Sequence, residues 1–584
     1  MSGRLIADVR PSPFGCSGLL AVDRINGNRR RGRTELRFAS CADPLLQGWH
    51  LQLSGQLRRP VRGSHALLPA AAERLARDGS WSQLRVEQFA VRARPGTPLA
   101  DTRRAIAVRL RQAAGDERGG LLAALVLGSA QVPLPNDLRQ SFRVAGLSHA
   151  LAASGFHLSV LLGSALALSR RWRSAYRLGF AAGALLLFLC LAGAQPSVVR
   201  AVVMGAAALL IRESGDRGKP FGLLLLSLSG MLLMHPAWAG SIGFQLSAAA
   251  TAGLILTAPR LEEAFRSWFP VRCQFLAPAL AIPIAAMAWT LPLQLLHFGS
   301  TPLYAVLANV LVAPLLAPLT LSAMVSALLS LLLPAGWLLG VLWPVQQLAG
   351  LLIALVSWIS HWPGAQLLTG HPQPWVVLLF ALGLLPWLLK GSGRMRGFAV
   401  LPLLAAVTTQ VTVQLGHGVV AVERFRTFWL LARFGGRAAL ITTKGDQHSC
   451  NLAGRLARGH GHTRLDWVMV LDPVATEAIS CWSSLARHVQ APQQGRPPLE
   501  AGQRLASDGL SVERPKDRRR PLILQVGRQR WQLLIHPQEL MTLQRDPQLV
   551  HSRSVVGTWL GFSPTKGQRR WLQNHPSGRR LAGD

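Results

Sequence analysis

Arg200 is the residue whose type and setting most clearly suggest chemistry. It lies in the segment Gln195–Ala201 (QPSVVRA), near the start of an apolar stretch that contains no acidic residue. An arginine at the centre of a bilayer costs about 2.5 to 3.5 kcal/mol on insertion scales, so such residues are usually functional. Two interpretations are open. Either the long side chain of Arg200 reaches a nearby interface, or it faces a polar cavity and meets an anion, for which phosphate suits a guanidinium best.

A second group of polar side chains lies at the start of the first apolar stretch. The segment Gly146–His157 (GLSHALAASGFH) contains His149, Ser154 and His157 among small residues. Helical spacing places the two histidines about 80° apart around the axis. A single histidine is more often packed and hydrogen-bonded than a ligand, but this concentration of polar and small groups suggests a lined cavity.

Uncharged polar residues recur further along the apolar region. Gln245 follows Gly243-Phe244. Asn309 lies in a stretch with prolines at 292 and 302 before it and at 314 and 318 after it. Interrupted helices beside polar residues are typical of a transport pathway. We therefore take His149, Ser154, His157, Arg200, Gln245 and Asn309 as candidate channel-lining residues.

The elements that must hold these residues are membrane helices. Half of the 584 residues are hydrophobic and only 15% are charged, against roughly 25% charged in a typical soluble domain. A span needs about 17 to 25 residues, and several segments are shorter. We expect about ten, near residues 150–168, 178–194, 196–211, 220–235, 242–258, 275–296, 302–333, 335–360, 374–389 and 397–415.

The charges of the connecting loops predict an orientation. Arginine and lysine collect after alternate segments, near residues 170–177, 212–219, 260–272 and 390–396, whereas the opposite loops, near 235–241, 297–301 and 361–373, are nearly uncharged. Basic short loops face the cytoplasm. The flanking regions are therefore predicted to lie outside it, in a protein of the inner (plasma) membrane.

The flanking regions are polar and strongly basic. Residues 1–120 carry 21 Arg against 10 acids, and residues 416–584 carry 25 Lys plus Arg against 12 acids. Orientation in the membrane does not explain this excess, and anionic lipid or nucleic acid would suit both ends. Cys16 and Cys41 lie in the first region, and Cys450 and Cys481 in the last. Each pair could form a disulfide or remain two buried thiols.

The first region shows the alternation of β-strands. Five short runs, at Leu5–Val9, Leu19–Ile25, Glu35–Phe38, Trp49–Leu57 and Leu84–Val91, alternate apolar and polar side chains. Five strands fit an OB-type barrel, a fold that often binds single strands through basic and aromatic side chains. Arg58, Arg59 and Arg62 are its candidate DNA-binding residues, although contact with DNA and a purely structural role are both open. Residues 96–145 then read as amphipathic linker helices.

Four motifs together resemble a known family. The segments Gly146–His157, Pro196–Met204, Gly243–Ser247 and Leu291–Pro314 are similar, in order and spacing, to the membrane core of the ComEC family of competence proteins. The resemblance implies an OB-like domain ahead of the core. It also implies a role in carrying one strand of DNA across the cytoplasmic membrane during natural transformation.

The C-terminal region resembles a degenerate form of the metallo-β-lactamase-like domain that ends many members of that family. Where the family has V-G-Q-G-D, L-I-D-T-G and H-x-[HD]-x-D-H, this chain has Leu415–Val419, Leu440–Lys444 and Asp472–Glu477. Val474 cannot bind a metal, so we expect no metal, no cofactor and no nuclease activity. His460 and His462 precede the strand that the family's ligands follow, which favours a solvated loop. Arg518, Arg519 and Arg520 either hold DNA phosphates or form soluble surface.

These observations predict a polytopic α-helical membrane protein with an N-terminal OB-like barrel (1–95), linker helices (96–145), a multi-span competence core (146–415) and a degenerate metallo-β-lactamase-like α/β domain (416–584). The expected function is a channel for single-stranded DNA rather than an enzyme. Expected partners are single-stranded DNA, membrane lipid, a DNA receptor and a cytoplasmic ATP-driven motor, because the chain has no G-x-x-x-x-G-K-[ST] phosphate loop. A homo-oligomer is left open. The alternatives are a transporter of a small anion or lipid precursor, and a membrane-anchored binding protein without a pore.

Overall fold

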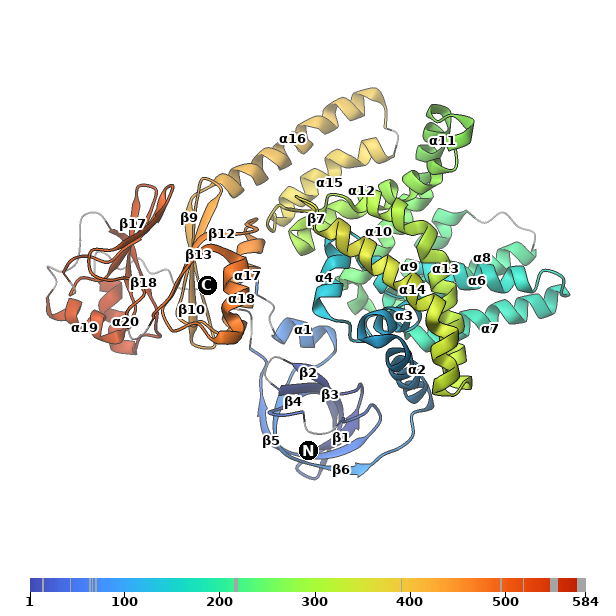
Figure 1. Ribbon diagram of the computed structural model, residues 1–584, viewed down its shortest axis with the longest axis horizontal. Coiled ribbons are helices and arrows are strands. Elements are labelled where there is room, and N and C mark those ends of the chain that lie inside the picture. The colour runs from blue at the N-terminus through green and yellow to red at the C-terminus, as the bar shows by residue number, and fades with distance from the viewer. Residues whose placement is uncertain are drawn as a thin grey trace.

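The chain folds into a β-barrel, a helical region and a C-terminal α/β region (Figure 1). The computed structural model describes residues 1–12, 15–41, 44–61, 63, 65, 67–68, 71–214, 219–389, 391–493, 496–517, 519–546 and 555–574. The barrel lies below the helical region in Figure 1, and the C-terminal region lies to the left of both.

The N-terminal barrel is closed by five strands. Its elements are β1 (Ser2–Leu5), β2 (Arg10–Ser12), β3 (Gly15–Ile25), β4 (Asn28–Phe38), β5 (His50–Arg58), α1 (Ala71–Arg77) and β6 (Gln83–Ala93). The strand order is β1-β5-β6-β4-β3, and β1 also pairs with β3, which closes the ring. Alternate side chains such as Leu20, Leu36, Leu51 and Leu53 fill the interior. The predicted five-stranded barrel is therefore confirmed.

One predicted strand of the barrel is misplaced. The run Leu5–Val9 was expected to be extended, but β1 ends at Leu5 and a bend follows. The amide nitrogen of Gln47 donates a 2.7 Å hydrogen bond to the Asp8 carboxylate, so the segment after β1 is tied to the loop before β5. A side-chain contact of this kind leaves no signal in an apolar–polar alternation.

The helical region contains all ten predicted apolar segments as helices. Its elements are α2 (Pro98–Ala114), η1 (Gly115–Gly119), α3 (Gly120–Leu127), α4 (Asn136–Val144), α5 (Ser148–Leu151), α6 (Gly155–Leu168), α7 (Ser174–Ala192), α8 (Pro196–Ser214), α9 (Pro220–Met234), η2 (Pro236–Gly240), α10 (Ile242–Leu256), α11 (Ala258–Trp268), η3 (Val271–Cys273), α12 (Leu276–Phe298), β7 (Ser300–Pro302), α13 (Ala305–Leu332), α14 (Ala335–Ser360), β8 (Gln366–Leu368), α15 (Pro374–Leu388) and α16 (Gly393–Leu415).

Fewer of these helices satisfy the length of a membrane crossing than the sequence predicted. In the described part of the chain, α7, α12, α13, α14 and α16 are long and apolar enough, and α10 with α11, bent by 47°, makes a sixth if the two form one span. The remaining apolar helices, α6, α8, α9 and α15, are shorter. The 14 residues of α6 extend only about 21 Å, against the ~30 Å of a hydrocarbon core.

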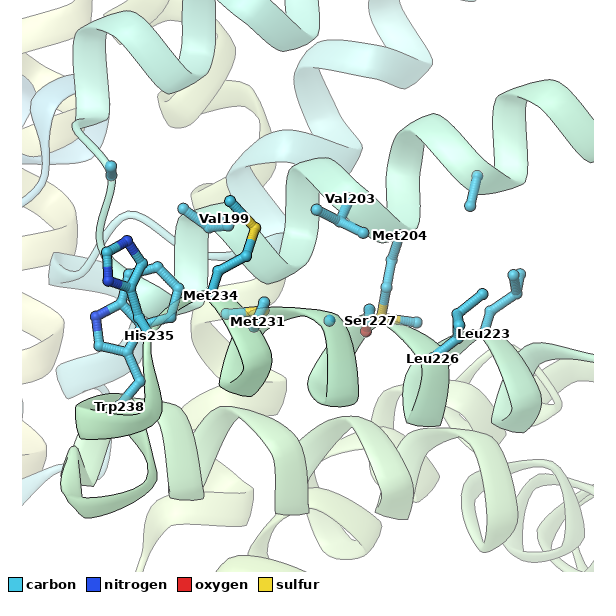
Figure 2. A pocket seen from close by; sticks show the side chains of 13 residues that line it. Val199, Val203, Met204, Leu223, Leu226, Ser227, Met231, Met234, His235 and Trp238 are labelled. Atoms are coloured by element: carbon cyan, nitrogen blue, oxygen red, sulfur yellow. The ribbon is translucent and has the colours of Figure 1, made fainter.

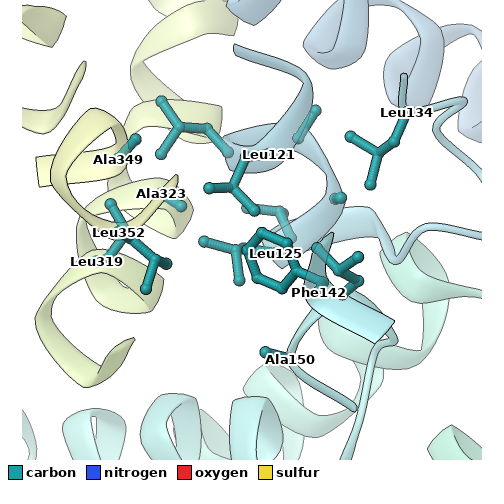
Figure 3. Close-up of a cluster of buried hydrophobic side chains, with 14 of the residues drawn as sticks. Leu121, Leu125, Leu134, Phe142, Ala150, Leu319, Ala323, Ala349 and Leu352 are labelled. Carbon is teal, nitrogen blue, oxygen red and sulfur yellow. The ribbon is translucent and has the colours of Figure 1, made fainter. Parts of the chain in front are cut away.

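The largest hydrophobic core of the helical region is centred on α3 (Figure 3). All eight residues of α3 are buried, and Leu121 and Leu125 pack between Phe142 of α4 and the α13 and α14 side chains Leu319 and Leu352. The buried face of α2 joins the same core through Ile106 and Leu110. The prediction that residues 96–145 form only linker helices is therefore revised, because part of this segment is the centre of the packed helical region.

The C-terminal region consists of two five-stranded sheets with helices on their outer faces. The first sheet has β9 (Gly418–Arg424), β10 (Thr427–Phe434), β11 (Arg437–Thr442), β12 (Leu465–Val470) and β13 (Ala486–Gln490), with α17 (Gln447–Gly459), η4 (Thr476–Ala478) and α18 (Ile479–Leu485). The second has β14 (Arg504–Ser507), β15 (Leu510–Glu513), β16 (Leu522–Val526), β17 (Gln529–Leu534) and β18 (Val555–Leu560), with α19 (Pro537–Arg545) and α20 (Lys566–Asn574).

Three hydrophobic layers hold this region together. Trp467, Met469 and Ile441 of the first sheet face Leu524 and Trp559 of the second. The opposite face of the first sheet packs on α17 and α18, and α19 and α20 pack together on the second sheet. The resulting order of layers is helix, sheet, sheet, helix, as an α/β domain with two apolar sheet interfaces requires.

Loops of low charge lie beside the C-terminal region. The amide nitrogen of His371 donates a 2.9 Å hydrogen bond to the Gly459 carbonyl at the end of α17, and β7 and β8, which flank the same surface, pair with each other. The arginine-rich turns between α6 and α7 and around α11 lie on the side away from the C-terminal region (Figure 1). The basic turns between α6 and α7 and around α11 are thus separated in space from the weakly charged segments at β7, β8 and His371.

Candidate functional site

Arg200 is turned into the helical bundle rather than toward an interface. Only 8% of the residue is exposed. Its Nε donates a 2.8 Å hydrogen bond to the Ser247 hydroxyl, and its Nη1 donates one of 2.5 Å to the Thr251 hydroxyl. Ser247 and Thr251 are four residues apart on α10, so they share one helix face toward α8. The buried position argues against a side chain that reaches the interface, and the two hydroxyls make the surroundings of the guanidinium polar.

No carboxylate pairs with Arg200 among the residues that the structure describes. Its partners are two hydroxyls and the Met204 sulfur, 3.6 Å from Nη1. A buried charge is normally paired or extensively hydrogen-bonded, because removing it from water is costly. The guanidinium is therefore held by neutral groups and retains its full positive charge for an anion.

The helix start at Gly155 brings the histidine segment beside Arg200. A Cβ added to Gly155 would lie 3.7 Å from Nη2 of Arg200, so the start of α6 approaches the guanidinium closely. His157 is fully buried, and its Nδ1 lies 3.1 Å from the Ser154 hydroxyl. Its Nε2 has no hydrogen-bond partner among the described residues. The start of α6, which carries Ser154 and His157, therefore lies beside the Arg200 guanidinium.

His149 occupies a different setting from His157. Its side chain is exposed, although α5 lies deep within the protein. Both histidines flank the extended break between α5 and α6, where Ala152 and Ser154 adopt strand-like backbone angles. A broken helix with polar residues on both sides of the break is the local geometry expected for a lined passage.

Gln245 and Asn309 have unequal roles in the structure. The Oε1 of Gln245 lies 2.7 Å from Nε2 of His297, which connects α10 to the end of α12. Asn309 instead donates a 2.7 Å hydrogen bond to the Ala305 carbonyl of its own helix. The structure therefore adds His297 to the polar residues around α10 and leaves Asn309 without a contact to the others.

A cavity of about 520 Å³ lies between α8 and α9 (Figure 2). Val199, Val203 and Met204 of α8 face Leu226 and Met231 of α9 across it, and His235 and Trp238 close one end. Arg200 is not among the residues that line this cavity. The cavity is thus an apolar feature next to the buried arginine, and Met204, whose sulfur contacts Arg200, lies between them.

The arginines proposed as DNA-binding residues from the sequence are dispersed. Arg58 ends β5 and donates to Gln56, and Arg59 beside it is exposed. Arg519 is exposed in the loop before β16, and the neighbouring Arg520 pairs with Asp517 at 3.7 Å. Arg62 and Arg518 lie outside the described residues. The structure does not gather these side chains into one site.

The four flanking cysteines lie in two disulfides. Cys16 is bonded to Cys41 at the barrel, and Cys450 of α17 is bonded to Cys481 of α18. Cys190 and Cys273 are free. Each disulfide connects elements within one flanking region, as the distribution of the cysteines allowed.

The positions that correspond to the expected metal motif carry a different set of residues. Asp472 follows β12, and Lys444 and His536 lie near it. Burial raises the pKa of the Asp472 carboxyl, while Lys444 and His536 oppose that shift. Val474 forms a backbone bridge with Gly445. Among the described residues no group of three or more His, Cys, Asp or Glu side chains could hold a metal ion.

His460 and His462 lie at a junction of all three parts of the chain. The rings of His460 and His65 are 6.1 Å apart, and Leu67 and Leu68 pack into the α17 core. Burial, followed by the charge of Arg433, lowers the pKa of His460 to about 3. The solvated loop expected here is therefore wrong, because these histidines pack between regions that are distant in sequence.

Sequence reasoning missed several polar residues of the core. Ser247 and Thr251 hold Arg200, and His297 holds Gln245. The spacing of Ser247 and Thr251 was a usable signal, because hydroxyls four residues apart on an apolar helix share one face. That this face meets Arg200 depends on the packing of α10 against α8, which the spacing does not reveal.

The comparisons with known proteins concern the helical region. Residues 125–393 match the family model described as Competence protein. ComE operon protein 3 of Bacillus subtilis (strain 168) is 28% identical over 201 residues, which is 33% of this chain and 24% of that protein. The uncharacterized protein YcaI of Escherichia coli (strain K12) is 27% identical over 212 residues, 33% of this chain and 27% of YcaI. The chain thus matches about a quarter of the length of these relatives. No solved structure matches.

Proposed function

We propose that this chain, whose membrane core is that of a ComEC-family competence protein, is a channel that carries single-stranded DNA across the cytoplasmic membrane. The observation that carries the proposal is Arg200, a buried guanidinium held by two hydroxyls and no described carboxylate. A strand of DNA presents one phosphate per nucleotide, and arginine is the side chain best matched to phosphate. A fixed positive charge on the path lowers the cost of bringing each phosphate into a low-dielectric region.

The path begins at the break between α5 and α6 and passes Arg200. His149 stands at the exposed end, Ser154 and His157 at the helix start, and Arg200 directly beside Gly155. Gln245 and His297 contribute neutral hydrogen-bonding groups, which can contact bases or sugars without holding them tightly.

The flanking regions support this function in different ways. The five-stranded barrel has the strand number of an OB fold, and we assign it that type. The helix–sheet–sheet–helix layers of the C-terminal region support its assignment as a degenerate metallo-β-lactamase-like domain. Because Lys444, Asp472 and Val474 occupy the motif positions, we propose that this domain has no nuclease activity and that the protein is not an enzyme.

The orientation and partners follow from the same proposal. Both disulfide-bonded flanking regions lie outside the cytoplasm, where such bonds persist. A DNA receptor delivers the strand on that side. A cytoplasmic ATP-driven motor, or another separate source of energy, draws it inward.

The alternative function, transport of a small anion or lipid precursor, would place the anion in a bounded pocket beside the membrane arginine. The cavity between α8 and α9 is lined by apolar side chains and lacks Arg200 (Figure 2). This cavity therefore does not combine an anion pocket with the membrane arginine, which favours the channel.

The test is natural transformation in a strain that lacks this gene. Complementation with the wild type should restore transformation, and Arg200→Ala should not, at equal protein level in the membrane. Asp472→Ala should transform as the wild type does, because the C-terminal site is proposed to be inactive. Normal transformation in the deletion strain would refute the channel.

A further inference from the structure

Four arginines from distant parts of the chain meet where the helical and C-terminal regions face each other. Arg143 belongs to α4, Arg424 ends β9, and Arg455 and Arg458 lie three residues apart on α17. We call them the interdomain arginine cluster. The Arg143 guanidinium lies 5.4 Å from the centre of the Phe298 ring, and a Cβ added to the next residue, Gly299, would lie 2.7 Å from the Gly370 carbonyl carbon. The following residue, His371, donates its 2.9 Å hydrogen bond to the Gly459 carbonyl beside Arg458, so Arg143 lies close to the end of α17. In agreement with this geometry, burial and then the charge of Arg455 lower the pKa values of Arg143 and Arg424.

The cluster reaches all three parts of the chain. Burial and then the charges of Arg143 and Arg455 lower the pKa of Arg458. Burial and then the charges of Arg455 and of Arg37 in the barrel lower the pKa of Arg424. The elements that carry them, α4, α17, β9 and β4, surround the centre of the molecule in Figure 1. Like charges repel, so folding brings these arginines together at an energetic cost.

No acidic side chain neutralises the cluster among the described residues. Its four arginines take part in none of the ion pairs found in that part of the chain. The nearby carboxylates are engaged elsewhere. Glu35 binds Arg37 and Arg74, and Asp446 accepts a 2.6 Å hydrogen bond from the Ser449 amide at the start of α17. A concentration of charge that the protein does not balance itself indicates an anionic ligand with several charges.

Exposed aromatic rings accompany the cluster. The Arg143 guanidinium lies 5.4 Å from the centre of the Phe298 ring, and Arg424 lies 5.2 Å from that of Phe425. Phe298 is 37% exposed and Phe425 is 55% exposed. Arginines beside accessible aromatic faces are the combination that binds single-stranded nucleic acid, because bases stack on the rings while phosphates meet the charges. A lipid headgroup has no base that could stack on the aromatic faces.

The cluster is continuous with the polar residues of the membrane core. Arg143 precedes the Gly146 turn and His149 of α5, and the Gly146 amide donates a 3.2 Å hydrogen bond to the Arg143 carbonyl. Phe298 directly follows His297, which contacts Gln245. A ligand bound at the cluster would therefore lie against the two segments that lead into the core.

We propose that the interdomain arginine cluster binds the phosphates of a DNA single strand, with bases stacked on Phe298 and Phe425, and delivers the strand to the break between α5 and α6. This inference rests on the proposed function, which it deepens by naming the residues that receive the strand. Arg143, Arg455 and Arg458 each contact a phosphate, and Arg424 extends the site toward the barrel.

The test uses the full-length protein in nanodiscs of zwitterionic lipid and a fluorescent oligothymidylate strand, with the binding constant measured by anisotropy over a range of salt concentrations. The variants are Arg143→Gln, Arg455→Gln, Arg458→Gln and the triple variant. Each lost phosphate contact should lower the slope of log K against log salt by about 0.7, so the triple variant should lose about 2. Its affinity near physiological salt should fall about tenfold or more.

Two controls separate binding from folding. Arg528→Gln, an exposed arginine in the turn between β16 and β17, removes one charge from the same domain and should leave affinity and slope nearly unchanged. Arg455→Lys keeps a charge for phosphate and should retain most of the binding. The Gln variants of the cluster should melt at or above the temperature of the parent, because removing a charge relieves the repulsion within the cluster of the free protein.

Unchanged affinity and slope in the triple variant would overturn the proposal. It is also overturned if the triple variant binds the strand normally but loses binding to phosphatidylglycerol vesicles, which would identify a lipid-headgroup site. Failure of the proposed function appears separately, as normal transformation in the deletion strain, and does not alter strand binding by the purified protein.

Discussion

Arginines in the barrel and in the membrane core are held in opposite ways. In the barrel, Glu35 is buried, and its carboxylate accepts hydrogen bonds from Arg37, Arg74 and Gln83. In the core, Arg200 is also buried, but its partners are the neutral hydroxyls of Ser247 and Thr251. The charges of Arg37 and Arg74 are balanced by Glu35, whereas no described carboxylate balances the charge of Arg200.

The difference separates structural charge from functional charge. A buried ion pair whose hydrogen bonds are satisfied does not require an additional ligand to balance its charge. A buried cation held by neutral groups keeps its field and can attract a passing anion. Variants that balance, remove or move these charges should therefore affect stability in the barrel and transport in the core.

The largest effect is expected at Arg200. Arg200→Gln keeps hydrogen bonds to Ser247 and Thr251 but removes the charge, and we expect transformation frequency to fall about a hundredfold, on the order of 3 kcal/mol for a lost charged hydrogen bond. Arg200→Lys should lie between Gln and the wild type. Membrane levels measured by immunoblot should be equal. A Gln variant that transforms normally would mean that the charge is not used.

The next effect is expected at Glu35. Glu35→Gln leaves Arg37 and Arg74 without a counter-charge, and because both arginines are about half exposed, solvent screens the loss to roughly 1–2 kcal/mol of barrel stability. The measurement is thermal unfolding of the full-length protein. Transformation at a permissive temperature should be near normal. Loss of transport with no loss of stability would mean that Glu35 acts in transport rather than in holding the barrel together.

A smaller effect is expected on acidification of the domain junction. Burial lowers the pKa of folded His460 to about 3, whereas an unfolded histidine has a pKa of about 6.5. The unfolded state therefore takes up the proton first, and the contribution of His460 is complete above about pH 6.5 and is lost as the pH falls toward 3. At pH 5 the loss is about 2 kcal/mol at most.

Unfolding of the full-length protein at pH 7 and pH 5, monitored by near-ultraviolet circular dichroism of its buried tryptophans, checks this expectation. His460→Gln cannot titrate, so its melting temperature should change less between the two pH values. An equal drop for both proteins would assign the acid sensitivity to other groups.

The smallest effect is expected at the hydroxyls that hold Arg200. Ser247→Ala removes one neutral partner at 2.8 Å and leaves Thr251, so transformation should fall only a few fold, corresponding to roughly 1 kcal/mol. Ser322→Ala is a matched control, since this exposed hydroxyl bonds only to the Pro318 carbonyl of its own helix. A loss at Ser247 as large as that of Arg200→Gln would show that orientation of the guanidinium matters as much as its charge.

The sequence predicted the elements better than their contacts. The helix α14 has the predicted bounds, because its apolar run is framed by Pro334 and His361. The burial of α3 within the predicted linker helices was missed, since its eight apolar residues have no amphipathic periodicity and are too short for a span. Local sequence patterns indicate which side chains are buried, but they do not indicate which distant segment packs against them.

The same limit applies to the functional residues. Arg200 and the His149–His157 segment could be identified because charge and polarity are conspicuous in an apolar sequence. The pairing of Arg200 with Ser247 and Thr251 depends on the packing of two helices. The interdomain arginine cluster joins Arg143 to Arg455, more than half the chain away, and no pattern near either residue distinguishes them from ordinary basic surface.

The central claim is that DNA phosphates pass Arg200 during uptake. The most direct measurement is the amount of fluorescently labelled DNA that becomes protected from added nuclease inside cells lacking the chromosomal gene and complemented with the wild type or with Arg200→Gln. The account predicts protected label with the wild type and almost none with the variant, while label bound at the cell surface stays equal. Equal protection in the two strains would contradict it.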